Sequence, residues 1–264
     1  MRRLLLIFLI LSGLVPLLTA CTQNRTVLVF GDSFTAESRR ELSAALEPQF
    51  KLGVNAFSGS ASCDWAENIR KQATTHHPAL VVIQFSGNAF SQCMSAFQAS
   101  AALVATKYRW DATLLSNMLT ALKIPHLFVG PPPAQPGMTR PDQDPVYASI
   151  ATLTPAWAHA VNAGSALGNA TGEWTSSLPC APQEGVEQGC RDGGIVVRSD
   201  DGYHFCPVAK DLTLPWGTPC PVYSSGATRY VAMIATAVRA ILPGIVPPTK
   251  SKVPTTFPRT VPTK

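Results

Sequence analysis

The sequence lacks the short cysteine and histidine spacings that usually hold metal ions. None of its seven cysteines forms a Cys-x-x-Cys pair, and none of its five histidines lies in a His-x-x-x-His pattern. Such spacings are typical of zinc sites. We therefore expect no metal and no other cofactor in this protein.

A basic face for nucleic acid is also missing, although the formal net charge is +5. Six positive charges lie near the two ends of the sequence and leave the rest of the chain at about −1; they are Arg2, Arg3, Lys250, Lys252, Arg259 and Lys264. Nucleic-acid-binding domains instead gather Lys and Arg on one face or helix. The sequence therefore excludes nucleic acid as a partner.

No apolar stretch is long enough to be a good membrane span. The stretch at residues 4–18 follows two arginines, and it is shorter than the ~20 residues that a membrane helix needs. A short positive region before such a stretch is typical of an export signal. Residues 18–21, LTAC, then resemble a bacterial lipobox, in which the cysteine is lipidated. The alternative is an ordinary secretory signal, with Cys21 incidental.

These segments predict how the chain is divided. We expect a lipoprotein signal peptide at residues 1–20, a tether at 21–25 and one domain at 26–243. Lipidation of Cys21 would anchor the exported protein to the outer face of the bacterial cytoplasmic membrane, because several acyl chains bind a bilayer stably. Residues 244–264 are rich in Pro, Thr and Lys, and we expect them to be disordered.

The six cysteines after Cys21 form an even set, which in an exported chain indicates disulfides. The sequence leaves their pairing open, because six cysteines allow many connectivities. The pairs we expect join cysteines that are neighbours in the sequence: Cys63–Cys93, Cys180–Cys190 and Cys206–Cys220.

Apolar runs alternate with helical patterns along the chain. The apolar runs predict strands at 27–30, 50–54, 79–85, 126–129 and 195–197. The helical patterns predict helices at 36–46, 66–74, 98–122, 146–161 and 224–242. This alternation predicts a parallel sheet with helices on both faces.

The stretch Thr26–Thr35, TVLVFGDSFT, places a serine at a functional position of such a sheet. Its apolar run ends in Gly31-Asp32-Ser33, so Ser33 follows the carboxyl end of the first strand. Ligands and chemistry collect at that end of an open α/β sheet. A serine hydroxyl is a weak nucleophile until a base takes its proton. Ser33 is therefore the candidate nucleophile, and it needs a base.

His204 is the best candidate for that base. It follows the predicted strand at 195–197, and Asp201 lies three residues before it. A carboxylate at that distance can hold the imidazole in the required tautomer. Asp200 competes for this role, and the spacing favours Asp201. The other histidines precede strands or lie in a helical pattern without a nearby acid: His76, His77, His126 and His159.

Ester chemistry also needs hydrogen-bond donors for a developing oxyanion. The backbone N–H of Ser33 is one candidate, and Gly59 and Asn88 follow the next two predicted strands. Glycine lets a backbone N–H approach a ligand closely, and the asparagine side chain carries an amide donor. The alternative is that Gly59 is only a turn glycine and Asn88 only a turn cap.

Four sequence blocks, in this order, resemble those of the SGNH hydrolases, also called GDSL esterases: Gly31-Asp32-Ser33, Gly59, Gly87-Asn88 and Asp201-x-x-His204. The resemblance implies a flavodoxin-like, three-layer α/β/α sandwich with a five-stranded parallel sheet. It implies that Ser33 is the nucleophile, His204 the base and Asp201 its orienter. It also implies an oxyanion hole formed by Ser33, Gly59 and Asn88.

The third block departs from the usual Gly-x-Asn-Asp, because Ala89 replaces the acid. The Gly-Asn block, the cysteines and a Cys-Pro after His204 also resemble extracytoplasmic SGNH domains that partner membrane acyltransferases. This resemblance implies a hydrolase or O-acyltransferase acting on a short acyl group, such as acetyl, of an envelope carbohydrate or lipid. Hydrolysis and transfer share one acyl-enzyme, so both stay open. An inactive SGNH-fold lipoprotein that binds a glycan or a partner is the alternative.

Overall fold

The computed structural model describes residues 25–138, 144–206 and 219–243. The predicted signal peptide, the lipidation site Cys21 and the predicted disordered tail lie outside these residues. They remain predictions, as do the domain limits. Within the described residues, no helix is both long and apolar enough to cross a membrane.

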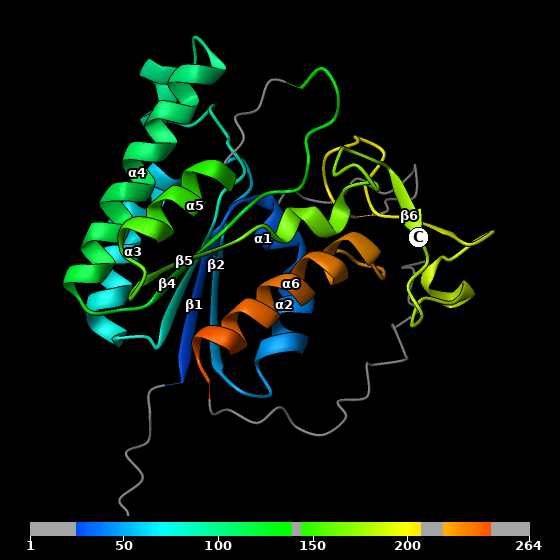
Figure 1. The fold of residues 1–264 in the computed structure, drawn as a ribbon, viewed down its shortest axis with the longest axis horizontal. Coiled ribbons are helices and arrows are strands. Elements are labelled where there is room, and N and C mark those ends of the chain that lie inside the picture. Colours follow the sequence, from blue (N-terminus) through cyan, green and yellow to red (C-terminus); the bar gives the residue numbers. More distant parts are fainter. Residues whose placement is uncertain (1–24, 139–143, 207–218, 244–264) are drawn as a thin grey trace, which may run out of the picture.

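The centre of the molecule is a five-stranded parallel sheet with the strand order β2-β1-β3-β4-β5 (Figure 1). All four neighbouring pairs are parallel. The strands are β1 (Thr26–Gly31), β2 (Lys51–Ala56), β3 (Leu80–Gln84), β4 (His126–Val129) and β5 (Ala158–Val161). The strand order reverses direction at β1, which places the loops after β1, β2 and β3 side by side at one edge of the sheet.

Helices cover both faces of this sheet, as the alternating pattern predicted (Figure 1). One layer contains α3 (Ser62–His76), α4 (Ala101–Ala121) and α5 (Asp144–Leu153). The other contains α1 (Ser33–Glu37), α2 (Arg39–Leu46) and α6 (Ser225–Ile241). Within the described ranges, three short 3-10 helices lie in the connections: η1 (Gln92–Phe97), η2 (Ala163–Leu167) and η3 (Val186–Gln188). The three-layer α/β/α architecture is therefore confirmed.

Alternation of side chains along β1 divides the interior into two cores. Val27 and Val29 join the core beneath α2 and α6, whereas Leu28 and Phe30 join the core beneath α3 and α4. All four side chains are buried, so β1 is a fully covered central strand. The position of Ser33 is thus fixed by packing on both sides of the strand that precedes it.

The prediction for the fifth strand was wrong. The fifth strand of the sheet is β5, and it pairs with β4. The apolar run at 195–197 instead contributes to β7 (Gly194–Val196), which pairs antiparallel with β6 (Ser177–Pro179) in a separate two-stranded sheet. The segment predicted as one helix at 146–161 contains α5 and then β5. β5 is an edge strand in which only Ala158 is buried, and its sequence, AHAV, has no continuous apolar run.

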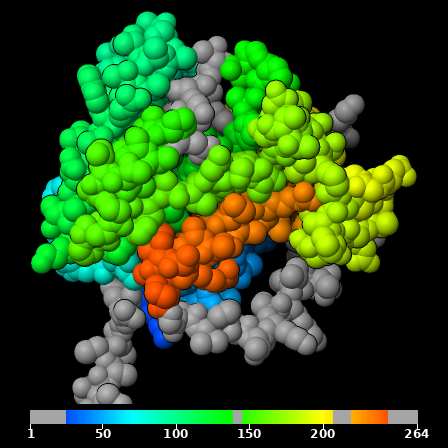
Figure 2. Space-filling view, in the orientation of Figure 1, coloured from blue at the N-terminus to red at the C-terminus, as the bar shows by residue number. Residues whose placement is uncertain are grey.

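Helix boundaries also differ from the predicted ones. The helix predicted at 36–46 begins at Ser33 and is broken at Ser38 into α1 and α2. The last predicted helix is confirmed as α6, and the Ser224 side chain caps it by accepting a hydrogen bond from the Ala227 N–H. In the space-filling view, α6 lies at the surface as the orange band across the molecule (Figure 2).

The three expected disulfides are confirmed: Cys63–Cys93, Cys180–Cys190 and Cys206–Cys220. The first joins the start of α3 to η1, so it connects the segments after β2 and β3. Disulfides persist in oxidising compartments outside the cytoplasm. Their presence is what an exported protein would show.

Candidate active site

The turn from β1 into α1 requires a glycine at its first position. A Cβ on Gly31 would lie 2.0 Å from the Thr35 Oγ1 and 2.6 Å from the Gln84 carbonyl oxygen. Asp32 then caps α1, because its Oδ1 accepts a hydrogen bond from the Phe34 N–H at 3.1 Å. Ser33 is therefore held as the first residue of α1, directly beyond the carboxyl end of β1.

Three side chains from distant parts of the sequence form one hydrogen-bonded row. The Ser33 Oγ lies 3.0 Å from the His204 Nε2, and the His204 Nδ1 lies 2.6 Å from the Asp201 Oδ2. The other Asp201 oxygen accepts hydrogen bonds from the backbone N–H groups of Tyr203 and His204. The carboxylate on the imidazole is thus Asp201 and not Asp200. These are the contacts a serine, its base and an orienting carboxylate require.

The surroundings of this row favour a charged pair of His204 and Asp201. Burial alone would raise the pKa of Asp201, but hydrogen bonds from His204, Ser199 and the backbone hold it well below its ordinary value. Burial alone would lower the pKa of His204, but the Asp201 hydrogen bond and the negative charge of Glu37 raise it above its ordinary value. An imidazolium formed by taking the serine proton is therefore stabilised.

Two predicted oxyanion donors are backbone N–H groups. Gly59 has a φ of +78°, a conformation that L side chains rarely adopt, and this explains glycine at that position. Within the described part of the chain, neither the Gly59 N–H nor the Ser33 N–H donates to a protein acceptor. Both groups can therefore donate to a ligand.

The third predicted donor, Asn88, is already engaged. Its Nδ2 donates to the Asp32 Oδ2 at 3.0 Å and to the Ser60 carbonyl oxygen at 3.1 Å. The backbone carbonyl oxygen of Asn88 accepts a hydrogen bond from the Tyr108 hydroxyl at 2.9 Å. An oxyanion would have to share one of these amide hydrogens. The structure thus places Asn88 between the loops after β1, β2 and β3, and its donor role remains a prediction.

Asp32 is a residue whose role sequence reasoning missed. Its side chain is fully buried, and its Oδ2 accepts from both the N–H and the hydroxyl of Ser86, each at 2.6 Å. It also accepts from Asn88. Asp32 therefore holds the loop after β3, in which Ala89 replaces the usual acid. An acidic residue directly after a fully apolar strand was the available signal.

The loop that carries His204 is anchored to three neighbouring segments. The Tyr203 hydroxyl lies 2.8 Å from the Ser86 hydroxyl, and the Phe205 N–H donates to the Glu37 Oε2 at 2.8 Å. Arg198, which is 2% exposed, donates to the Pro133 carbonyl oxygen. Sequence reasoning missed these contacts, because each joins residues far apart in the chain.

The remaining histidines lie away from this site. His76 and His77 are at the end of α3. His126 begins β4 at the opposite end of the sheet, where its Nε2 contacts the Ser116 hydroxyl at 2.9 Å. His159 lies in β5 and not in the helical segment predicted for it.

A cavity of about 540 Å³ opens beside Gly59. Phe57 and Phe90 line it with side chains that are 70% and 91% exposed. Asp64 and Trp65 of α3 and polar residues of the loops after β2 and β3 complete its wall. The cavity therefore combines aromatic faces with hydrogen-bonding groups next to a predicted oxyanion donor.

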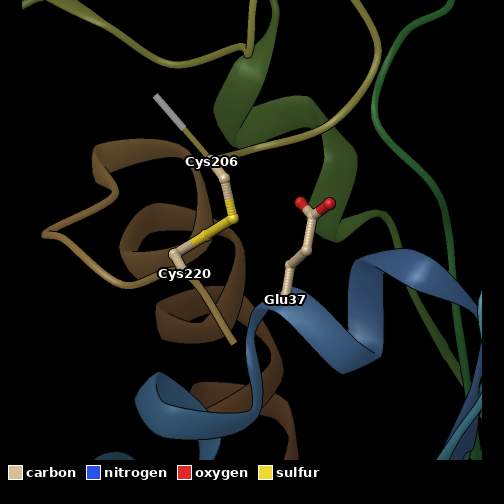
Figure 3. A group of neighbouring side chains, drawn as sticks. All are labelled: Glu37, Cys206 and Cys220. Atoms are coloured by element: carbon tan, nitrogen blue, oxygen red, sulfur yellow. A yellow bond between two sulfur atoms is a disulfide. The ribbon is translucent and has the colours of Figure 1, made fainter. Parts of the chain in front are cut away.

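Two clusters in the described part of the chain bring three potential metal-binding atoms together. One contains Glu37 with Cys206 and Cys220, and the other contains Asp64 with Cys63 and Cys93. In both clusters the two sulfurs are joined in a disulfide, as Figure 3 shows for the first. A disulfide offers no thiolate, so the donor set does not suit a metal.

Comparison with known proteins places this fold. No curated protein matches the sequence. Among solved structures, a "putative acylhydrolase" from Bacteroides fragilis superposes with a TM-score of 0.52 at 13% identity, covering 84% of this chain and 90% of that one. The lipase/acylhydrolase from Enterococcus faecalis superposes with a TM-score of 0.51 at 17% identity, covering 86% of this chain and 100% of that one. A GDSL-like lipase from Bacteroides thetaiotaomicron superposes with a TM-score of 0.49 at 17% identity, covering 82% of this chain and 89% of that one.

At these identities the likeness establishes the fold. Residues 26–213 match the family described as "Protein of unknown function (DUF459)". This match spans most of the chain and includes all four sequence blocks. The chain therefore belongs to that family, and its fold is that of the SGNH, or GDSL, hydrolases.

Proposed function

We propose that this protein is a serine esterase that hydrolyses or transfers a short acyl group through an acyl-enzyme. The observation that carries the proposal is the row of Ser33, His204 and Asp201, with 3.0 Å and 2.6 Å between the contacting atoms. The SGNH fold supports it, because the neighbours of that fold include proteins named as acylhydrolases and lipases.

In the first half-reaction the His204 Nε2 takes the Ser33 proton while the Ser33 Oγ attacks the ester carbonyl carbon. The carbonyl oxygen becomes an oxyanion facing the Ser33 and Gly59 N–H groups, with Asn88 as a third donor. The C–O bond to the leaving alcohol then breaks, and His204 gives that alcohol its proton. Asp201 keeps the imidazole oriented throughout and stays ionised.

The second half-reaction releases the acyl group. Water, or a hydroxyl of a second carbohydrate, loses its proton to His204 and attacks the acyl-enzyme carbonyl. Collapse of that intermediate returns the proton to the Ser33 Oγ. Water as acceptor gives a hydrolase and a sugar hydroxyl gives an O-acyltransferase, with the same residues acting in both.

The cavity beside Gly59 supports an acylated carbohydrate as the substrate in preference to a long-chain lipid. Sugar rings present apolar C–H faces and polar hydroxyls, so they suit a wall of exposed phenyl rings mixed with hydrogen-bonding groups. Phe57 and Phe90 supply the rings, and Asp64 supplies a carboxylate that disfavours an anionic ligand. A long acyl chain would instead need a continuous apolar channel.

The envelope location rests on the resemblance of residues 18–21 to a lipobox and on the three disulfides. A lipid on Cys21 would hold the enzyme at the outer face of the bacterial cytoplasmic membrane. There it would meet acylated envelope carbohydrate and, as an acyltransferase, could act beside a membrane acyl donor protein.

The variant Ser33→Ala tests the proposal. It should abolish turnover of p-nitrophenyl acetate and of acetylated sugars while the circular dichroism spectrum is unchanged. Activity equal to that of the unmodified protein would overturn the assignment. Glycan binding without turnover of any short-chain ester would favour the alternative, a binding protein that has lost catalysis.

A further inference from the structure

Glu37 lies one helical turn after the candidate nucleophile. Ser33 and Glu37 are the first and last residues of α1, four positions apart, and residues at that spacing share one face of a helix. The Ser33 Oγ contacts His204, and the Glu37 Oε2 accepts from the N–H of Phe205, the next residue along the chain, at 2.8 Å. One helical turn therefore contacts both the imidazole and the backbone beside it.

Further contacts hold this arrangement. The Phe34 ring packs on the Phe205 ring with 4.7 Å between centroids. The Glu37 side chain extends from α1 beside the Cys206–Cys220 disulfide, which closes onto the same segment (Figure 3). The Cys220 N–H is 3.4 Å from the Glu37 carbonyl oxygen. Glu37 is thus contacted from both sides by chain that continues from His204.

The charged groups that act on Glu37 belong to the row of Ser33, His204 and Asp201. His204 and Asp201 both act on it electrostatically, and the adjacent disulfide is neutral. From α2, Arg40 directs its guanidinium to Glu41 and to the Val222 carbonyl oxygen. Among the described residues, His204 is a positively charged group that lowers the pKa of Glu37.

Burial raises the pKa of Glu37 to about 7, and His204 and the Phe205 N–H oppose that rise. The influence is mutual, since Glu37 raises the pKa of His204. Burying a carboxyl without a basic partner is costly. Glu37 nevertheless lies on the helical turn that also carries Ser33, and its carboxylate contacts the backbone next to the base.

We propose that Glu37 is a positioning residue of the active site: it fixes the backbone beside His204 against α1 and places a second carboxylate, in addition to Asp201, near the imidazolium. This inference deepens the esterase function proposed above. Asp201 orients the ring through Nδ1, whereas Glu37 acts through the backbone and through its charge. The separation of these two tasks makes it testable.

The test uses Glu37→Gln in the full-length chain. Glutamine keeps an oxygen acceptor for the Phe205 N–H and removes the charge. The matched control is Glu41→Gln, which removes a carboxyl whose burial also raises its pKa but which pairs with Arg40. The pKa of the His204 imidazole is measured by NMR titration, with its signal assigned by the loss of that signal in His204→Asn.

We expect Glu37→Gln to lower the pKa of His204, because the imidazolium loses a nearby negative charge, and Glu41→Gln to leave it unchanged. The acid limb of kcat against pH should move to lower pH in Glu37→Gln alone. Glu37→Asp keeps the charge but shortens the side chain, so it should keep the limb near its original pH and lower kcat by roughly tenfold through misplacement of the base.

An unchanged His204 titration in Glu37→Gln would overturn the inference. So would an equal change in the Glu41→Gln control. The NMR measurement needs no turnover, so it decides the role of Glu37 even if no ester is cleaved. Absence of turnover in the unmodified protein would count against the esterase function instead, and the two failures are therefore distinguishable.

Discussion

The hydroxyl of Tyr203 lies 2.8 Å from the hydroxyl of Ser86. This contact joins the loop that carries the candidate base to the loop after β3. The Ser86 hydroxyl in turn donates a hydrogen bond to the buried Asp32 carboxylate. The turn that carries Ser33, the loop after β3 and the loop that carries His204 are therefore linked by side-chain hydrogen bonds as well as by the sheet.

Tyr203→Phe should remove this link while keeping the aromatic packing against Phe34. A neutral hydrogen bond contributes about 1 kcal/mol, so we expect a several-fold fall in kcat with little change in KM. Ser86→Ala should act on the same contact. In a double-mutant cycle, the combined variant should lose less than the sum of the two single losses. Strictly additive losses would mean that the contact does not couple the loops.

Asn88→Ala should lower kcat by about 10²–10³-fold if the amide donates to the oxyanion. KM should change little, because the interaction strengthens only as charge develops on the carbonyl oxygen. The folded state should persist, since Asp32 still holds the loop through Ser86. The measurement is steady-state kinetics with acetyl esters. A rise in KM with an unchanged kcat would show that Asn88 only shapes the loop.

The Cys206–Cys220 bridge should matter for activity as well as for stability, because Cys206 lies two residues after His204. Replacing both cysteines by alanine should cost up to about 3 kcal/mol of unfolding free energy in the chain-entropy model and should also lower kcat.

The Cys180–Cys190 bridge is the matched control for that experiment. It spans 10 residues against 14 and makes no contact with the catalytic row in the described residues. Its removal should lower the melting temperature and leave kcat of the folded enzyme unchanged. Equal kinetic losses in the two variants would contradict a specific link between Cys206–Cys220 and the base.

The lowered pKa of Glu184 predicts how the free energy of unfolding changes with pH in acidic solution. It is 5% exposed, and its carboxylate contacts Arg229 at 2.5 Å. Burial alone would raise the pKa of Glu184, but hydrogen bonds from Arg229 and Ser225 lower it from 4.5 to about 2. A lowered pKa stabilises the fold above pH 4.5, and this contribution is lost as the pH falls from 4.5 to about 2.

Glu184→Gln should therefore lower the unfolding free energy by about 3 kcal/mol near neutral pH, because it breaks a buried pair. The difference from the unmodified protein should shrink as the pH approaches about 2. Urea denaturation across this pH range measures it. A difference that stays constant with pH would contradict the assignment of the effect to the charge of Glu184.

Most of the fold and the row of Ser33, His204 and Asp201 were predictable because their signals are local. Val27–Phe30 is a continuous apolar run that ends in a glycine and a serine, and Asp201 and His204 are three positions apart. Each block could be placed after an element without knowing the others. Hydrogen bonds then bring Ser33, His204 and Asp201 together in the predicted order.

What the sequence did not reveal depends on long-range contact. β5 is a partly buried edge strand, and the apolar run in β7 pairs with β6 outside the main sheet. Neither choice is visible from periodicity alone. The roles of Asp32 and Glu37 likewise depend on Ser86 and Phe205, which lie 54 and 168 residues away in the chain.

Covalent trapping tests the central claim most directly. After incubation with a fluorophosphonate or an acetyl donor and rapid acid quench, mass spectrometry of the digested protein should find one adduct, on the Ser33 hydroxyl. The adduct should disappear in His204→Ala, because the serine then has no base. No adduct under these conditions, or an adduct on another residue that persists in Ser33→Ala, would contradict the account.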